Sequence, residues 1–204
     1  FIEGFRDSEL ESRLLVLGSS AQYGADSSIT KPLKEDQQTQ PSNYYGETKD
    51  NQEKIALSFH EKYGIDVLCT RPGSLVGKGV STHLLSGFLT EKFKKNEKTI
   101  KIEISNSSDV RDYIDVRDTC SALLHLQEMT GINGDVFNIS ANQLLSNLEL
   151  IKVYEKISEK RALVTYSQPD KTPTKIWLDN SKLAKCCNFQ PKFSIEDSVR
   201  WNLS

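Results

Sequence analysis

Two side chains four positions apart, Tyr45 and Lys49, carry the strongest chemical signal in this sequence. On a helix this spacing places both side chains on one face, one turn from each other. A free tyrosine has a pKa of about 10 and is a poor acid or base at neutral pH. An ammonium beside it favours the phenolate and brings that pKa towards the working range. The pair therefore predicts a proton-transfer device, although the same spacing also occurs by chance on solvated helices.

A second group of candidate residues follows two short apolar runs. Residues 14–18 and 65–71 are mostly apolar, and each run has a length typical of a buried strand in a parallel sheet. Ser19 and Ser20 follow the first run, and residues 72–74 interrupt the second. Because ligands of open α/β sheets bind beyond the carboxyl ends of the strands, we expect both turns to face a ligand.

The stretch between the two runs is expected to hold a long loop over residues 25–42 and then the helix that carries Tyr45 and Lys49. Ser42 or Asn43 can cap this helix, and Gly64 can end it. The stripe that the helix buries is expected to be Ile55, Ala56, Phe59 and Tyr63. A strand, a helix and a second strand in this order predict a βαβ unit.

Shorter elements are expected after residue 80. Helices are expected over residues 84–95, 146–159 and 180–187, and two more are expected to start at Asp118 and Ser194. Strands are expected over residues 100–104, 136–139, 163–166 and 176–178. The predicted fold class is therefore α/β: the C-terminal portion of a doubly wound parallel sheet, followed by a small α/β lobe.

The composition excludes several other classes of protein. A net charge of −2 over 204 residues gives no reason to expect a nucleic-acid partner or an anionic membrane surface. No apolar run approaches the length of a membrane span, and the N-terminus is not a signal peptide. The four cysteines have no framework spacing, which favours reduced thiols and a cytoplasmic protein. The three histidines are too far apart to suggest a metal site.

Six short motifs occur in a fixed order along nearly the whole chain. They are GSSAQYG at 18–24, P-x-x-YYG-x-x-K at 41–49, RP-x-x-x-x-G at 71–77, RDY-x-DV-x-D at 111–118, VFNI at 136–139 and DNSKL at 179–183. Any one of them is a weak signal, but six in order are a strong one. In this order they resemble the extended short-chain dehydrogenase/reductases that act on nucleotide sugars, the NAD-dependent epimerase/dehydratase family.

The resemblance implies a catalytic role for three residues. Tyr45 matches the catalytic acid/base, and Lys49 matches the partner that also holds the nicotinamide ribose. Ser19 matches the hydroxyl that hydrogen-bonds the reacting sugar oxygen. The implied cofactor is NAD or NADP. The residues implied to bind it are Tyr45 and Lys49, together with Pro72, Gly73, Ser74 and Leu75 at the nicotinamide end.

The resemblance also implies a set of substrate-binding residues, which are Ser19, Ser20, Ser74, His83 and Arg111. Arg111 matches an arginine that reaches the nucleotide diphosphate, a role suited to a planar cation with several donors. An ion pair of Arg111 with Asp112, Asp115 or Asp118 is the alternative. For Asp115 and Asp118 themselves, local capping and pairing with Arg117 are the better interpretation than paired catalytic carboxylates.

In domain terms, the resemblance implies that residues 1–80 form part of a Rossmann-type NAD(P)-binding domain that carries Ser19, Tyr45 and Lys49. Residues 81–204 would be mainly a small substrate-binding lobe, with residues 107–140 returning to the Rossmann sheet. The helix with Tyr45 and Lys49 often forms a four-helix bundle between two copies in this family, which implies a homodimer.

Within the family, the motifs are most similar to the reductases of GDP-4-keto-6-deoxy-mannose, so the expected function is reduction of a 4-keto nucleotide sugar. A nucleotide-sugar 4-epimerase, which needs the same serine, tyrosine and lysine, is the alternative. Dehydratases normally carry an acidic residue where this chain has Ala21, and alanine cannot act as a base. The identity of the nucleotide sugar and the choice between NAD and NADP stay open.

The main departure from the family is the lack of a Gly-x-x-Gly-x-x-Gly turn, which would seat the pyrophosphate on a helix N-terminus. The chain also starts at Phe1 rather than at a methionine, which suggests a fragment or a trimmed product. A non-catalytic remnant that binds a sugar nucleotide or serves assembly is therefore a further alternative. Smaller departures are Ser74 in place of the usual asparagine and Lys78 in place of the usual proline.

Overall fold

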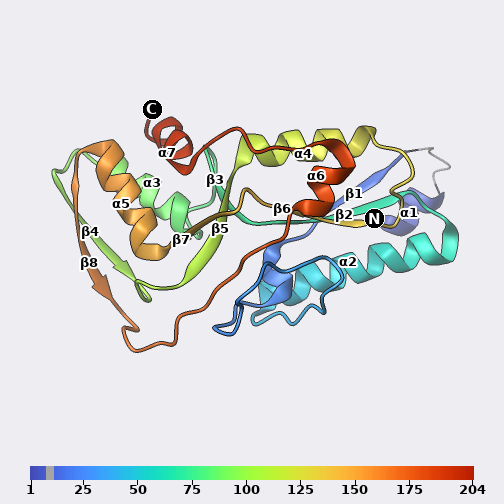
Figure 1. Cartoon of the computed structure of the whole chain (residues 1–204), viewed down its shortest axis with the longest axis horizontal. Coiled ribbons are helices and arrows are strands. Elements are labelled where there is room, and N and C mark those ends of the chain that lie inside the picture. Colours follow the sequence, from blue (N-terminus) through green and yellow to red (C-terminus); the bar gives the residue numbers. More distant parts are fainter. Residues whose placement is uncertain (8–11) are drawn as a thin grey trace.

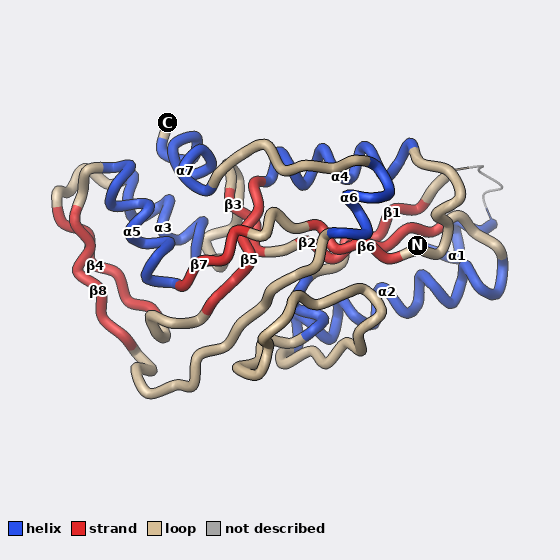
Figure 2. Tube along the Cα trace, viewed as in Figure 1, coloured by secondary structure: helices blue, strands red, loops and turns tan. Residues whose placement is uncertain are grey.

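The computed structural model describes residues 1–7 and 12–204, and within these residues the strands form three sheets (Figures 1 and 2). The first sheet is entirely parallel and has the order β1-β2-β6. Its strands are β1 (Leu14–Leu17), β2 (Val67–Pro72) and β6 (Val136–Ile139). The expected α/β fold with a parallel sheet is therefore confirmed.

Helices cover both faces of this first sheet (Figure 1). They are α1 (Ile2–Asp7), α2 (Tyr44–Tyr63), α4 (Val116–Glu128) and α6 (Ser181–Cys187). Val67 and Cys69 pack with Ala56 of α2, whereas Leu68 packs with Leu126 of α4 on the other side. Because successive side chains of a strand point to opposite faces, every residue of β2 is buried.

Helix α2 has the expected ends, but the face that it buries agrees only in part with the expected one. The Asn43 side chain accepts a hydrogen bond from the Gly46 N–H, and Gly64 ends the helix in the left-handed conformation with φ 68°. Of the predicted apolar stripe, Ala56 is buried and Phe59 is half-buried, but Ile55 is 53% exposed and Tyr63 is 42% exposed. The buried face is Gly46, Asp50, Glu53 and Ala56. It includes two carboxylates because this face packs partly against polar partners, so apolar periodicity alone misplaced it.

The remaining elements form a smaller lobe, drawn on the left of Figure 1. Its strands are β3 (Ser74–Val76), β5 (Val110–Asp115) and β7 (Gln143–Ser146) in one sheet, and β4 (Thr99–Ile104) and β8 (Arg161–Tyr166) in a parallel pair. Its helices are α3 (Leu85–Lys94), α5 (Asn147–Ser158) and α7 (Ile195–Leu203). Alternate residues of β4 point into the core of this lobe, where they meet all three helices.

Two sequence predictions about the bounds of elements need correction. Residues 176–178 do not form a strand, because among them only Leu178 makes a β-bridge, to Leu33, and the neighbouring Lys175 makes a separate bridge to Val110. Helix α4 begins at Val116 rather than at Asp118, because the Asp115 side chain caps it. Strand β5 was not predicted: it is rich in charge, yet Asp112 and Asp115 are buried with hydrogen-bond partners.

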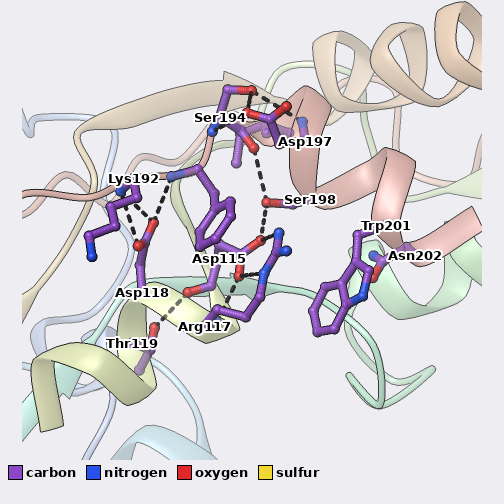
Figure 3. A network of polar contacts seen from close by, with 12 residues as sticks. Asp115, Arg117, Asp118, Thr119, Lys192, Ser194, Asp197, Ser198, Trp201 and Asn202 are labelled. Carbon is purple, nitrogen blue, oxygen red and sulfur yellow. Dashed lines mark hydrogen bonds and ion pairs between the residues drawn. The ribbon is translucent and has the colours of Figure 1, made fainter. Parts of the chain in front are cut away.

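A polar network around Asp115 joins β5 to α4 and α7 (Figure 3). The Asp115 carboxylate accepts hydrogen bonds from the Arg117 guanidinium at 2.8 and 2.9 Å and from the Ser198 hydroxyl at 2.6 Å. The guanidinium in turn lies over the rings of Phe193 and Trp201, 3.6 and 4.2 Å from their centroids. The predicted capping and pairing role of Asp115 is confirmed.

Asp118 has a separate structural role in the same network. Its carboxylate accepts hydrogen bonds of 3.0 Å from the backbone N–H groups of Lys192 and Phe193 (Figure 3). It therefore holds the segment before α7 against α4. The prediction that Asp118 caps a helix and pairs with Arg117 is therefore wrong. Asp115 takes both of these roles, whereas Asp118 binds the backbone of a segment that is distant in the sequence.

We predict that Asp115→Asn lowers the free energy of unfolding by about 2 kcal/mol at pH 7, because it weakens charge-assisted hydrogen bonds of a fully buried carboxylate. Burial raises the pKa of Asp115, but the hydrogen bonds from Arg117 and Ser198 outweigh burial and hold the pKa below its ordinary value of 3.8. The stabilisation is thus fully present above that value and is lost as the pH falls through the folded-state pKa.

Urea unfolding of both proteins across pH checks this prediction. The difference between Asp115→Asn and the unaltered protein should be constant from about pH 5 to 8 and shrink below about pH 4. Asp7→Asn is the control: Asp7 also bonds an arginine, but its side chain is 64% exposed, so its effect should be close to zero. A difference that persists unchanged into acid would contradict the prediction.

Candidate functional site

One pocket gathers nearly all of the predicted site residues. It is a cavity of about 290 Å³ at the carboxyl ends of β1 and β2. The predicted residues that line it are Ser19, Ser20, Tyr45, Lys49, Pro72, Gly73, Ser74, Leu75 and Arg111. They come from four segments that are far apart in the sequence, and the parallel strand ends bring them together.

The first wall of the pocket is the turn that follows β1. Ser20–Tyr23 form a single 3₁₀ turn, η1, and Ser19 caps it. The Ser19 Oγ accepts a hydrogen bond from the Ala21 N–H at 3.2 Å. The Ser19 N–H donates to the Gln22 Oε1 at 2.8 Å, which completes a capping box. Since a hydroxyl can donate as well as accept, Ser19 keeps a proton to offer to a ligand oxygen.

The second wall is the first two turns of α2. Tyr45 is 55% exposed, and its side chain lines the pocket together with Lys49 one turn later. The Lys49 Nζ donates to the Leu17 carbonyl at 2.8 Å and to the Gln52 Oε1 at 3.2 Å. This anchoring holds the ammonium at the end of β1, next to the Ser19 turn. The predicted one-face arrangement of Tyr45 and Lys49 is present.

Arg111 lies in the opposite wall, at the junction with the smaller lobe. Its guanidinium donates to the carbonyls of Val110 and Thr174 at 2.8 and 3.0 Å and to the Thr174 hydroxyl at 3.1 Å. Its nearest carboxylate is that of Asp109 at 3.9 Å. The alternative ion pair with Asp112, Asp115 or Asp118 is therefore wrong, because those carboxylates are bound elsewhere. Arg111 stays available at the pocket wall as a partly exposed cation.

His83 does not reach this pocket. It lies against a neighbouring hollow of about 310 Å³ between α3 and β4, and Leu84 lines both hollows. The role of His83 as a substrate-binding residue stays a prediction. Among residues 1–7 and 12–204, no group of three potential metal-ligating side chains occurs, and no helix is long and apolar enough to cross a membrane.

A buried polar network behind the pocket was missed in the sequence. Glu53 accepts hydrogen bonds from Gln22 at 3.0 Å and from the Arg71 guanidinium at 2.5 and 3.0 Å. The guanidinium also lies over the Tyr23 ring, 4.7 Å from its centroid. The available signal was spacing, because Glu53 lies four residues after Lys49 and so continues the same helical face into the interior.

Burial affects the pKa values of this network. Burial raises the pKa of Tyr23 to about 12, although the Arg71 guanidinium opposes this shift. Burial alone would lower the pKa of Arg71, but the hydrogen bond with Glu53 and the charge of Glu53 keep that pKa above its usual range. Arg71 is therefore a permanent cation, and Tyr23 keeps its proton to donate to the Asn138 Oδ1 at 2.9 Å.

Comparison with known proteins identifies the same family as the motifs did. The sequence pattern of the NAD dependent epimerase/dehydratase family matches residues 2–140. The chain is 29% identical to the UDP-glucuronate 4-epimerase of Thermodesulfobacterium geofontis, over 98% of this chain and 60% of that protein. It is 24% identical to the GDP-6-deoxy-D-mannose reductase of Pseudomonas aeruginosa, over 93% of this chain and 64% of that protein. The chain thus spans less than two thirds of the length of these relatives.

A solved structure supports the same conclusion about the fold. The chain superimposes on RMD from Pseudomonas aeruginosa complexed with NADPH with a TM-score of 0.89 and 21% sequence identity. The match covers 99% of this chain and 69% of that one. It shows that the three-stranded parallel sheet is part of a Rossmann-type fold, as the sequence predicted.

We predict that Gly46→Ala destabilises the protein by about 1–3 kcal/mol, because a Cβ at this position has no room. It would lie 2.6 Å from the Ala21 carbonyl oxygen and 2.9 Å from the Pro41 Cβ, so α2 would have to move away from the Ser19 turn. Gly4→Ala in α1 is the control, since a Cβ there meets nothing within 4 Å and alanine favours a helix. Urea unfolding measures both, and equal effects would contradict the close packing described.

Proposed function

Since this chain belongs to the NAD dependent epimerase/dehydratase family, we propose that it acts as a reductase of a 4-keto nucleotide sugar with NAD or NADP as the cofactor. The observation that carries the proposal is the pocket, in which Ser19, Tyr45 and Lys49 meet at the carboxyl ends of two parallel strands. A neutral pocket wall without these three groups would support only binding.

The residues present fit the nicotinamide end of such a cofactor. The backbone of residues 72–75 forms one side of the pocket, and at Gly73 a Cβ would lie 2.6 Å from the Asp112 carbonyl oxygen, so the chain is packed tightly there. Lys49 supplies a fixed donor at the same end. When bound, the reduced dinucleotide supplies the hydride that the keto carbon of the sugar accepts.

The three side chains then have distinct tasks in the proposed mechanism. Ser19 donates a hydrogen bond to the keto oxygen and fixes its position. Tyr45 donates a proton to that oxygen as negative charge develops on it. Lys49, one turn after Tyr45 on the same face of α2, supplies a hydrogen-bond donor that is held at the end of β1. Arg111 at the far wall is suited to the diphosphate of the substrate, since it has several donors and a permanent charge.

A nucleotide-sugar 4-epimerase is the second candidate function. The observation that favours it is the relative with 29% identity, a UDP-glucuronate 4-epimerase, since the reductase relative is 24% identical. The same three side chains would serve, because epimerisation adds the reverse reaction before the reduction: Tyr45 would take the proton of the 4-hydroxyl while the carbon gives its hydride to the oxidised dinucleotide, and reduction on the other face of the sugar would return both. Dehydration is disfavoured because Ala21, at the pocket wall, has no acidic group. A non-catalytic sugar-nucleotide-binding or assembly remnant is the third candidate, and a lack of turnover by the natural protein would distinguish it from the other two.

The remaining parts of the proposal concern organisation. Residues 1–80 are proposed as part of the dinucleotide-binding domain, and residues 81–204 mainly as the substrate-binding lobe, with residues 107–140 returning to the sheet. The pairing of β6 with β2 supports this return for residues 136–139, whereas β5 pairs within the smaller lobe. The exposed Ile55 and Tyr63 of α2 support a homodimer through that helix. Four free cysteines support a cytoplasmic location.

The test is a turnover assay of the natural protein, expressed from its complete reading frame, with 4-keto sugar nucleotides and either NADH or NADPH. A reductase oxidises one reduced dinucleotide for each sugar converted. An epimerase interconverts two sugar nucleotides with no net oxidation. Binding of sugar nucleotides without any turnover would support the non-catalytic candidate and refute both enzyme candidates.

We predict that Tyr45→Phe lowers kcat by about 10²–10⁴-fold, because it removes the proton donor. Stability should change little, since the side chain is 55% exposed. Tyr44→Phe is the matched control: Tyr44 is the preceding residue, is 80% exposed and lies outside the pocket lining, so its kcat should be unchanged. Steady-state kinetics of both variants decide the point, and full activity of Tyr45→Phe would remove the catalytic assignment.

A further inference from the structure

The buried side chain of Gln22 connects the pocket to the network behind it. Gln22 is fully buried, and both ends of its amide are used. Its Oε1 accepts from the Ser19 N–H at 2.8 Å, and its Nε2 donates to the Glu53 Oε2 at 3.0 Å. An N–H can only donate and a carboxylate can only accept, so these two partners allow one orientation of the amide.

The carboxylate that receives Gln22 is itself immobilised. Glu53 is 3% exposed and Arg71 is 5% exposed, and two hydrogen bonds of 2.5 and 3.0 Å join them as a fork. Unpaired charges at this depth would be very costly, so the pair keeps its geometry. The guanidinium is held from further sides by the Glu35 carbonyl at 3.2 Å and by the Tyr23 ring.

The hydrogen bonds of this network therefore fix the distance between the Ser19 turn and helix α2. Tyr45, Lys49 and Glu53 are spaced by four and four residues, so one helical face carries the proposed acid, its lysine and the buried carboxylate. The space at Gly18 is consistent with this role, because a Cβ there would lie 2.3 Å from the Gln22 Oε1. The strand end therefore has no room for a side chain at position 18 beside the glutamine amide.

We propose that Gln22 is a positioning residue that holds Ser19 in register with Tyr45, and that the Glu53–Arg71 pair fixes Gln22 for this purpose. This inference rests on the proposed function, since it assigns Gln22 an effect on the reaction through the Ser19 hydroxyl. A purely structural role would instead leave the Ser19 geometry, and therefore the chemical step, unaffected in any protein that stays folded.

The first experiment is a double-mutant cycle between Gln22 and Ser19 in the natural protein. Gln22→Met keeps the length of the side chain but removes both hydrogen bonds. We expect it to lower kcat by about tenfold to a hundredfold, since small displacements of a reacting group have effects of this size. The KM for the dinucleotide should not change. In a Ser19→Ala background the same substitution should change kcat by less than about twofold, because the hydroxyl it positions is already absent.

A second variant keeps the inference testable if Gln22→Met does not fold. In Gln22→Glu the new carboxylate can still accept from the Ser19 N–H, but it faces Glu53, so one of the two must hold a proton for both bonds to persist. We expect kcat to recover towards that of the unaltered protein as the pH falls. An unchanged pH profile would overturn the inference.

The possible outcomes separate this inference from the proposed function. If the unaltered protein converts no nucleotide sugar, the proposed function fails and the inference fails with it. If the unaltered protein is active but Gln22→Met has the same effect with and without the Ser19 hydroxyl, only the inference fails. A loss that disappears in the Ser19→Ala background supports both.

Discussion

The buried ion pair between Glu53 and Arg71 is the constraint on which the arrangement of the pocket depends. Two charges removed from water are stable only with close to ideal geometry, so the pair admits little variation in how α2 lies on β2. Arg71 directly precedes the backbone that lines one side of the pocket, and Glu53 lies two turns after Tyr45. The Glu53–Arg71 ion pair thus fixes α2 relative to the segment that follows Arg71. The hydrogen bonds of Gln22 connect the same pair to the Ser19 turn, which is the third wall of the pocket.

The pocket lies where the chain passes from one sheet to the next. Strand β2 pairs with β6 in the parallel sheet, and after Gly73 the chain continues as β3, which pairs with β5 in the smaller lobe. Only a glycine allows this passage, because a Cβ would lie 2.6 Å from the Asp112 carbonyl oxygen of β5. The same passage brings Arg111 of β5 towards the turn after β1. The cavity therefore combines the strand ends of one lobe with a cation of the other.

The sequence predicted the parts of this arrangement that depend on local signals. The apolar runs before Gly18 and Pro72 predicted two parallel strands, and Asn43 and Gly64 marked the ends of α2, because capping and left-handed geometry require particular residue types. The motif order predicted which residues meet in the pocket. The buried face of α2 was missed, because Asp50 and Glu53 are buried through partners distant in sequence that no periodicity reveals. Strand β5 was missed for the same reason, and the place of His83 depends on how α3 lies against β4.

In the proposed function, a nucleotide sugar places its reacting oxygen between Ser19 and Tyr45. The most direct measurement is a crystal structure of the natural protein with a bound sugar nucleotide and dinucleotide. We expect the oxygen on the reacting carbon to lie within hydrogen-bond distance, about 2.6–3.2 Å, of both the Ser19 Oγ and the Tyr45 Oη. We also expect the diphosphate to lie on Arg111. A sugar ring bound elsewhere, with Ser19 and Tyr45 facing solvent, would contradict the proposed roles of these residues.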